Sequence, residues 1–521
     1  MTKKGKIIIA ITSAAVAAVV GMVIALNSDK IFAEKVNSDF TVNYDGIKTA
    51  SIRAGVSVHD PSILKAEGTY YIFGSHMSGA SSTDLRTWTS IGNGYTPGNP
   101  LFDNLFATDH VFDYAGSNIS VIPTDDGGRH VWAPDVIYNK AQGLYYMYFC
   151  TTSTWNASNL CYATSKNPEG PYAWQGALIY SGFTEETLAY TDVTDYVTQD
   201  FALENYVTPK NEYNFNEYPN AIDPAVFYDE EGRLWMVYGS WSGGIFLLEL
   251  DESTGEVIHP EADPANNVDA YYGKKLIGGG HKSIEGPYIL YDARSGYYYL
   301  FVSYGGLESD GGYQIRQYRS ENPQGPYVDP SGKTLDDEDD HYNYGLKMMG
   351  NYTFPSLDCT YMAPGGQSTF VSTDGGRYIT YHQRFDDGSE YHEPRVHQMF
   401  LNEEGWYVAA PFAASGASIE TGTYDRGDIS GTFYIVNHGT DIGSKVHRAA
   451  EYTFAEDGTI TGEEASGTFA VKDGTAYIDI DLDGKVYHGV IIEMDDEAGN
   501  PVRAIMAAGE SNETIWCVQY Q

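Results

Sequence analysis

The sequence predicts an all-β protein: a five-bladed β-propeller followed by a small antiparallel β-barrel. Five segments of the chain share one strand–turn–strand pattern, and the last hundred residues change to short strands between glycine turns. The chain also contains 44 Tyr and 56 Gly, which suit strands and tight turns respectively. Repeated antiparallel units spaced by tens of residues indicate a radial array of sheets.

Each repeated segment opens with a short polar motif, continues as an apolar strand, turns, and returns as an aromatic-rich strand. The five segments begin at His59, Trp132, Ile222, Ile284 and Gly365. In a propeller the first strand of every blade lines the central channel, so the opening residues of all five segments should meet at one mouth of the channel. Residues separated by more than two hundred positions are thereby expected to become neighbours.

The chain divides into three parts. Residues 1–34 combine Lys3, Lys4 and Lys6 with an apolar run from Ile7 to Leu26, which predicts export through a cleaved signal peptide or an uncleaved membrane anchor. Residues 48–415 form the predicted propeller and residues 416–521 the barrel. An acidic, tyrosine-rich insert at 184–218 is expected either to cover the channel mouth or to be a surface excursion.

Charge excludes one class of partner. The chain carries 31 basic and 71 acidic residues, a net charge of −40. Nucleic acids and anionic membrane surfaces require basic patches, so we expect no nucleic-acid partner and no membrane contact except through an N-terminal anchor. Neutral polysaccharides remain compatible with this charge.

Four cysteines, Cys150, Cys161, Cys359 and Cys517, are too few for a disulfide framework, and their spacing does not predict a metal site. Cys150 and Cys161 are positioned to face each other across a hairpin. The other two are predicted to be unpaired.

Carboxylates open four of the five segments: Asp60, Asp135, Asp223 and Glu285. Cleavage of a glycosidic bond requires one carboxyl group that is protonated and one that is ionised. A third carboxylate nearby keeps one partner protonated through like-charge repulsion. Convergence at one channel mouth would meet this requirement.

The ordered motifs of these segments resemble those of glycoside hydrolase family 43, and within it the arabinanases. The matching stretches are His59-Asp60-Pro61, Trp132-Ala133-Pro134-Asp135, Asn220-Ala221-Ile222-Asp223-Pro224, Gly239-Ser240-Trp241-Ser242-Gly243-Gly244 and Ile284-Glu285-Gly286-Pro287-Tyr288. The tail resembles the small barrel that follows the propeller in longer arabinanases. The resemblance therefore covers nearly everything after the N-terminal segment.

This resemblance implies catalytic roles for three carboxyl groups. Asp60 would be the general base that activates water, Glu285 the general acid, and Asp223 the group that raises the pKa of the acid and orients it. The family inverts, so Asp60 and Glu285 are expected roughly 6.5–9.5 Å apart. Asp135 is expected to occupy the same location and to fix the channel by hydrogen bonds, without a catalytic step.

Four further residues are candidates for binding the substrate. Trp132 and Trp241 are predicted to stack on arabinose rings, with core packing as the alternative. Asn220 and Ser240 are predicted to bond sugar hydroxyls, with structural turns as the alternative.

The resemblance also points to a calcium ion. Relatives often carry a channel histidine at the start of the fifth blade, which holds the ion through water. The aligned place here reads Gly366-Gln367, and His382 is the candidate substitute, either as a metal ligand or as an ordinary channel residue. Calcium prefers oxygen ligands, and the chemistry itself requires no cofactor.

The predicted function is that of a secreted or surface-anchored inverting endo-1,5-α-L-arabinanase that degrades plant-wall arabinan, with arabinoxylan or xylan as other substrates. Two alternatives stay open at this point. One is an exo-acting α-L-arabinofuranosidase or β-xylosidase of the same family. The other is a propeller that binds glycans without cleaving them.

Overall fold

The computed structural model describes residues 46–95, 98–102, 110–336, 339–414 and 422–520. The predicted signal or anchor at 1–34 lies outside these ranges. Within them, no helix has the length and apolar character needed to cross a membrane.

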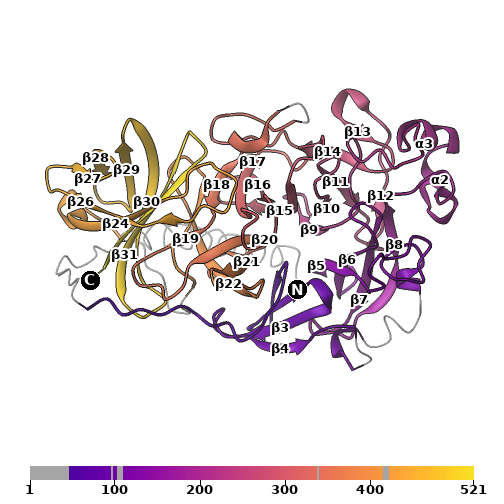
Figure 1. Cartoon of the computed structure of the whole chain (residues 1–521), viewed down its shortest axis with the longest axis horizontal. Helices are drawn as coiled ribbons and strands as arrows, with labels where there is room; N and C mark the ends of the chain where they lie inside the picture. The colour runs from indigo at the N-terminus through magenta and orange to yellow at the C-terminus, as the bar shows by residue number, and fades with distance from the viewer. Residues whose placement is uncertain (1–45, 96–97, 103–109, 337–338, 415–421, 521) are drawn as a thin grey trace, which may run out of the picture.

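Five antiparallel sheets stand around a common axis, which confirms the predicted propeller (Figure 1). Blade one contains β1 (Ser62–Ala66), β2 (Thr69–Gly74), β3 (Ser78–Ser82) and β4 (Thr89–Gly92). Blade two contains β5 (Val131–Asn139), β6 (Leu144–Thr152), β7 (Ser158–Ser165) and β8 (Ala173–Tyr180). Blade three contains β9 (Ala225–Tyr228), β10 (Leu234–Tyr238), β11 (Ile245–Leu250), β12 (Val257–Ile258), β13 (Val268–Asp269) and β14 (Gly273–Ile277). Blade four contains β15 (Ile284–Asp292), β16 (Tyr297–Tyr304), β17 (Gln314–Ser320) and β18 (Leu346–Met349). Blade five contains β19 (Tyr352–Thr353), β20 (Tyr361–Val371), β21 (Arg377–Phe385), β22 (His392–Leu401) and β23 (Tyr407–Ala409), and it takes in β25 (His447–Arg448) from the C-terminal part.

In blades two and four the second strand is the most apolar, because the neighbouring blades cover both of its faces. In β6 and β16 nearly every side chain is buried, so these strands are continuous aromatic and aliphatic runs without polar alternation. The insert contributes a 3-10 helix η5 (Leu188–Tyr190) and two short helices, α2 (Val193–Tyr196) and α3 (Gln199–Asn205). Leu188, Val193 and Ala202 of these helices pack into the core between blades two and three.

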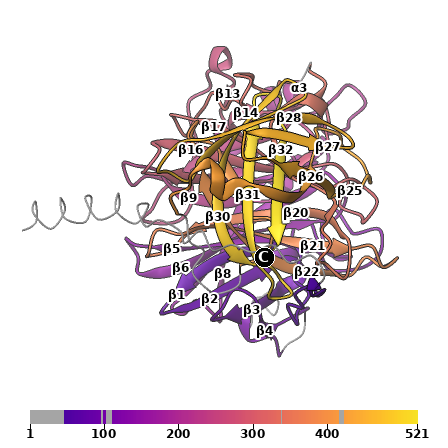
Figure 2. The ribbon, with the colours of Figure 1, turned by 90° about the vertical axis from the view of Figure 1, so that its left-hand side faces the viewer.

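The C-terminal part is a closed barrel of eight antiparallel strands, as predicted. Its strands are β24 (Gly431–Asn437), β26 (Ala450–Phe454), β27 (Thr459–Gly462), β28 (Ser466–Val471), β29 (Tyr477–Leu482), β30 (Lys485–Asp495), β31 (Pro501–Gly509) and β32 (Thr514–Tyr520). Seen from its own end, the barrel stands in front of the blades (Figure 2). One hydrophobic core runs continuously from blades four and five into the barrel.

Two sets of hydrogen bonds join the barrel to the propeller. One is a pairing of strands, and the other runs from barrel side chains to the backbone of the segment before β1. Strand β25 of the barrel segment pairs in parallel with β19 of blade five. The segment before β1 also runs along the barrel before it enters blade one (Figure 1). There, Asn500 bonds both the N–H and the C=O of Lys48, and Glu497 accepts from the N–H of Ile52 at 2.7 Å. The barrel thus anchors the segment that leads to Asp60.

A left-handed residue marks the channel-mouth end of the innermost strand of every blade; it precedes the strand in blades one and three and lies within it in the other blades. These residues are Asp60 (φ 51°), Ala133 (φ 40°), Asp223 (φ 55°), Gly286 (φ 56°) and Gly366 (φ 58°). Proline follows the first four. The strand register shifts at this place in blades two, four and five, as expected of a β-bulge. Non-glycine residues in this conformation carry strain and are typical of functional sites.

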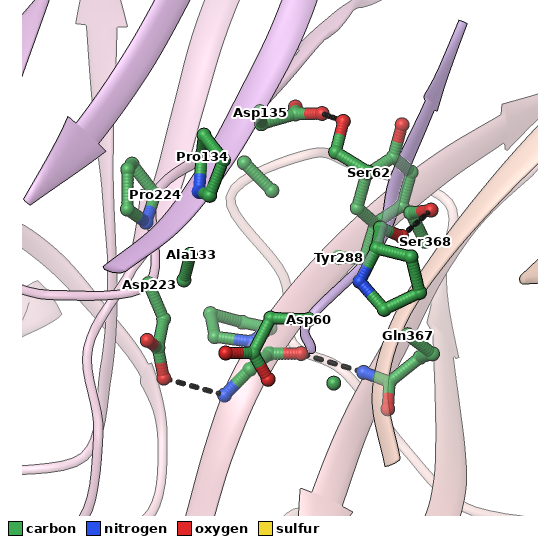
Figure 3. Close-up of a pocket in the computed structure, with 15 residues that line it drawn as sticks. Asp60, Ser62, Ala133, Pro134, Asp135, Asp223, Pro224, Tyr288, Gln367 and Ser368 are labelled. Carbon is green, nitrogen blue, oxygen red and sulfur yellow. Dashed lines mark hydrogen bonds between the residues drawn. The ribbon is translucent and has the colours of Figure 1, made fainter. Parts of the chain in front are cut away.

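This repeat corrects the expected place of Asp135. The residue equivalent to Asp60 in blade two is Ala133, and Asp135 lies two positions further along β5. Its carboxylate therefore sits deeper in the channel, at the opposite end of the lining from Asp60 and Asp223 (Figure 3). The prediction equated Asp135 with Asp60 because both are aspartates, although the residue that precedes proline in blade two is Ala133. It was therefore two residues out.

The expected facing of Cys150 and Cys161 is also wrong. Cys150 pairs with Leu160, and Cys161 pairs with Phe149. Cys161 is therefore offset by one residue from the position opposite Cys150, and the two side chains point to opposite faces of the sheet. All four cysteines are free thiols.

Gly366 generates a first prediction. A Cβ at this position would lie 2.3 Å from Oδ1 of Asp60 and 3.0 Å from Nδ1 of His382. We expect Gly366→Ala to lower the free energy of unfolding by about 1–3 kcal/mol more than Gly375→Ala, measured by chemical denaturation. Gly375 is the matched control, since it is in the same blade and also has a positive φ, but has nothing within 4 Å of an added Cβ. Equal losses in the two variants would contradict the close approach.

Candidate active site

The first predicted site residue, Asp60, is held in its ionised form. His59 Nδ1 lies 2.7 Å from Oδ2 of Asp60, and the hydroxyl of Ser75 donates to the same oxygen at 2.6 Å. Burial by itself would raise the pKa of this carboxyl, but His59 and the bond from Ser75 bring the pKa well below its usual range. Asp60 is therefore suited to act as a base.

Asp223 and Glu285 form a neighbouring pair whose pKa values are raised, in contrast to the pKa of Asp60. Burial raises the pKa of both carboxyl groups, and repulsion from Glu285 raises the pKa of Asp223 further. Each is fixed by named donors: the backbone N–H of Gly286 donates to Asp223 at 3.1 Å. The hydroxyls of Ser240 and Tyr313 donate to the two oxygens of Glu285 at 2.9 and 2.8 Å. Such a pair retains a proton under conditions in which Asp60 is ionised.

The carboxylate of Asp135 is held by hydrogen bonds from the two neighbouring blades. It accepts hydrogen bonds from the hydroxyl of Ser62 and, at 2.7 Å, from the backbone N–H of Val226. It thereby ties the first strands of blades one, two and three together. Burial raises its pKa to about 6. The role expected of it, to hold the channel by hydrogen bonds, agrees with these contacts.

A cleft of about 600 Å³ extends from Glu285 along the mouth, and all four predicted binding residues line it: Trp132, Asn220, Ser240 and Trp241. Two of them already bond protein groups: Ser240 holds Glu285, and the amide of Asn220 donates to the carbonyl of Trp155 at 2.7 Å. Trp132 and Trp241 line the cleft, and Trp132 also packs against the core between blades two and three. No described residue of the 184–218 insert lines it.

His382 lies beside Asp60, as the sequence predicts. Its ring stacks on His59 with centroids 3.9 Å apart, and its Nδ1 is 3.7 Å from Oδ1 of Asp60. Ligand atoms of His59, Asp60 and His382 all lie within 4.8 Å of one another. The Nε2 of His382 is buried and has no hydrogen-bond partner among the described residues. A metal ion or a water is the kind of partner that this atom lacks.

Sequence reasoning missed two residues that shape the site, Ser75 and Tyr313, and the contact that a third residue makes. Ser75 bonds Asp60 and also accepts the N–H of Ala133 at 2.9 Å, which links blades one and two. Tyr313 precedes β17 and reaches Glu285 from outside any repeated motif. Gly366 was singled out in the sequence, but its close approach to Asp60 exists only because blade five packs against blade one.

Comparison with known proteins agrees with this geometry. Residues 54–200 and 196–407 match the family described as glycosyl hydrolases family 43. Residues 411–517 match a C-terminal lipocalin-like domain. The extracellular endo-α-(1→5)-L-arabinanase 2 of Bacillus subtilis (strain 168) is 36% identical over 479 residues, which cover 88% of this chain and 92% of that protein.

Solved structures show the same two-part architecture. The endo-1,5-α-L-arabinanase of Thermotoga petrophila RKU-1 superposes with a TM-score of 0.77 at 34% identity, covering 91% of this chain and 100% of that one. A family 43 glycoside hydrolase of Bacillus licheniformis gives a TM-score of 0.76 at 37% identity, covering 91% and 99%. The matched family spans the whole propeller and the relatives span both parts, and on these grounds the chain belongs to glycosyl hydrolase family 43.

Proposed function

We propose that this protein is an inverting endo-1,5-α-L-arabinanase that degrades plant-wall arabinan outside the cell. The observation that carries the proposal is the contrast in surroundings between neighbouring carboxyl groups at one channel mouth. Asp60 is held ionised by His59 and Ser75, while burial and mutual repulsion keep a proton on the pair formed by Asp223 and Glu285. Glycoside hydrolysis requires this combination.

Each group then has a defined task. Asp60 removes a proton from a water molecule that attacks the anomeric carbon. Glu285 donates its proton to the oxygen of the leaving sugar, and Ser240 and Tyr313 hold its two oxygens in place. Burial and the like charge of Asp60 raise the pKa of Glu285, and Asp223 is assigned the task of adding to this repulsion and orienting the acid. Because inversion uses a single displacement, Asp60 and Glu285 act in the same step.

The substrate and the mode of cleavage are supported by the relatives and by the cleft. The Bacillus subtilis relative is named an extracellular endo-arabinanase, and the N-terminal segment predicts export, either into the medium or to a surface anchor. The cleft beside Glu285 is free of described insert residues, which favours binding within a chain over capture of a chain end. Arabinoxylan and xylan are further substrates to be tested.

The proposal is tested by a product time course on debranched linear arabinan. We expect a ladder of oligosaccharides from the wild type and a fall in kcat of about 10³-fold in Glu285→Gln, which cannot donate the proton. Glu321→Gln, an exposed glutamate of blade four, is the control and should behave as the wild type. Arabinose as the sole early product would indicate exo action, and no product from the wild type would disprove the proposal.

Tyr313 predicts the sign of a pH effect. Its hydroxyl stabilises the ionised form of Glu285, so Tyr313→Phe should raise the pKa of Glu285 further above its usual range. The acid works only while protonated, and the alkaline limb of the kcat/KM profile should therefore move to higher pH, by up to about one unit. Tyr318→Phe in the same blade removes a hydroxyl that bonds Tyr304 and should leave the limb in place. A shift to lower pH would show that Tyr313 does not stabilise the carboxylate.

We also propose a calcium site at His382. The unpartnered, buried Nε2 of His382 is the feature that fits a ligand role. Calcium takes about six to eight oxygen ligands, and Asp60 is the single carboxylate in the cluster of His59, Asp60 and His382, so water would supply most of the coordination. When bound, such a cation would add positive charge beside Asp60 and favour its ionised form. The proton transfers themselves are assigned to carboxyl groups.

Calcium binding can be measured without reference to activity. Isothermal titration of chelator-treated protein with calcium should give a saturable heat in the wild type and none in His382→Ala. His488→Ala, a barrel histidine that bonds Asp479, should retain the heat. A wild type that binds no calcium, or a His382→Ala variant that binds it equally, would disprove the site.

A further inference from the structure

An aromatic wall borders the cleft beside the general acid. We use this name for Trp155, Phe215, His281 and Trp241, which come from four separate segments of the chain. Trp155 meets Phe215 and His281 edge-on, with ring centroids 4.8 and 5.0 Å apart. His281 also contacts Phe215 at 5.3 Å and Trp241 at 5.4 Å. Three members, Trp155, His281 and Trp241, line the same cleft as Glu285.

The wall is held in place by the backbone beneath it. The carbonyl of Trp155 accepts from the amide of Asn220, and the N–H of His281 donates to the carbonyl of Ser242 at 2.9 Å. His281 itself adopts a left-handed conformation with φ 58°. These bonds fix the backbone from which the rings of Trp155 and His281 extend.

Trp155 stands out within the wall because 55% of its surface is exposed. Phe215 and His281 pack against the indole at interplanar angles of 77° and 65°, and Trp155 lines the cleft. A scattered exposed apolar residue needs no explanation, but an exposed indole in a concave site that contains the acid is a ready binding surface. Sugar rings present apolar C–H faces, and a rigid indole covers such a face at little cost in conformational entropy.

The position of the aromatic wall relative to Glu285 and Asp60 indicates on which side of the cleaved bond the wall lies. Glu285 lines the cleft and Asp60 does not; Asp60 instead lines the channel together with Asp223 (Figure 3). In an inverting hydrolase the acid faces the departing oxygen, and the base faces the opposite side of the cleaved sugar. The departing oxygen belongs to the sugar on the reducing-end side of the cleaved bond.

We infer that the aromatic wall is a subsite for the leaving part of the arabinan chain, in which an arabinose ring on the reducing-end side of the cleaved bond stacks on Trp155. This inference rests on the proposed function. Phe215 gives the 184–218 insert a role in it: the insert does not line the cleft but supports the ring that does.

The test uses arabinohexaose labelled at its reducing end, so that the frequency of cleavage at each bond can be counted. We expect Trp155→Ala to lower kcat/KM about tenfold, since removal of an anchoring aromatic ring commonly costs this much or more. We also expect cleavage to move toward the reducing-end bonds, because fewer sugars are then held beyond the acid. Trp155→Phe should show a smaller change in the same direction.

Tyr190→Ala is the matched control, since Tyr190 is an aromatic residue of the insert with 61% exposure. It should keep the wild-type cleavage pattern. A cleavage pattern unchanged in Trp155→Ala would overturn the wall as a subsite, and a shift toward the non-reducing end would overturn its assignment to the leaving side. If Trp155→Ala does not fold, the pattern of Trp155→Phe decides in the same way. A wild type inactive on arabinohexaose would instead overturn the proposed function, and the inference with it.

Discussion

The left-handed residue at the channel-mouth end of each innermost strand is the constraint on which the site depends. In blades two, four and five the strand register shifts at this place, as expected of a bulge. Asp60 and Asp223 occupy the left-handed position in blades one and three. In the other three blades this position is Ala133, Gly286 or Gly366. These small residues leave room, and the Gly366 position shows how little room is spare.

Burial at the channel axis has opposite consequences for carboxyl groups that differ in their neighbours. Asp60 receives bonds from His59 and Ser75, which outweigh its burial and keep it ionised. Asp223 and Glu285 are coupled to each other instead, and their repulsion adds to the effect of burial. Carboxyl groups with opposite tendencies to hold a proton therefore lie within one mouth. The difference comes from the neighbouring charges: His59 lies beside Asp60, whereas Asp223 and Glu285 lie beside other carboxyl groups.

The barrel is part of the structure that surrounds the site. Val446, in the segment that leads into β25, packs against Tyr313, Met362 and Ala363. Tyr313 in turn donates to Glu285. On the other side, Asn500 and Glu497 of the barrel hold the segment that enters blade one just before Asp60. Glu285 and Asp60 are each connected to the barrel by a short chain of contacts.

Sequence alone predicted the five blades and the barrel, and it singled out three carboxyl groups whose catalytic roles stay a prediction. Each blade repeats a local pattern of strand, turn and aromatic strand, and local patterns are legible without knowledge of the fold. The strand-opening motifs were legible for the same reason, since the bulge before proline is a local feature. The two residues that were displaced, Asp135 by two positions and Cys161 by one register, show the precision that such patterns reach.

Only the tertiary structure decided what the carboxyl groups and the cleft can do. The pKa of Glu285 depends on Ser240 and Tyr313, which reach it from different segments of the chain, and Tyr313 lies outside every repeated motif. The aromatic wall joins Trp155 to His281 across more than a hundred residues of sequence, and its use depends on which catalytic carboxyl shares its cleft. Protonation and shape are set by distances between blades, and those distances exist only once the propeller has closed.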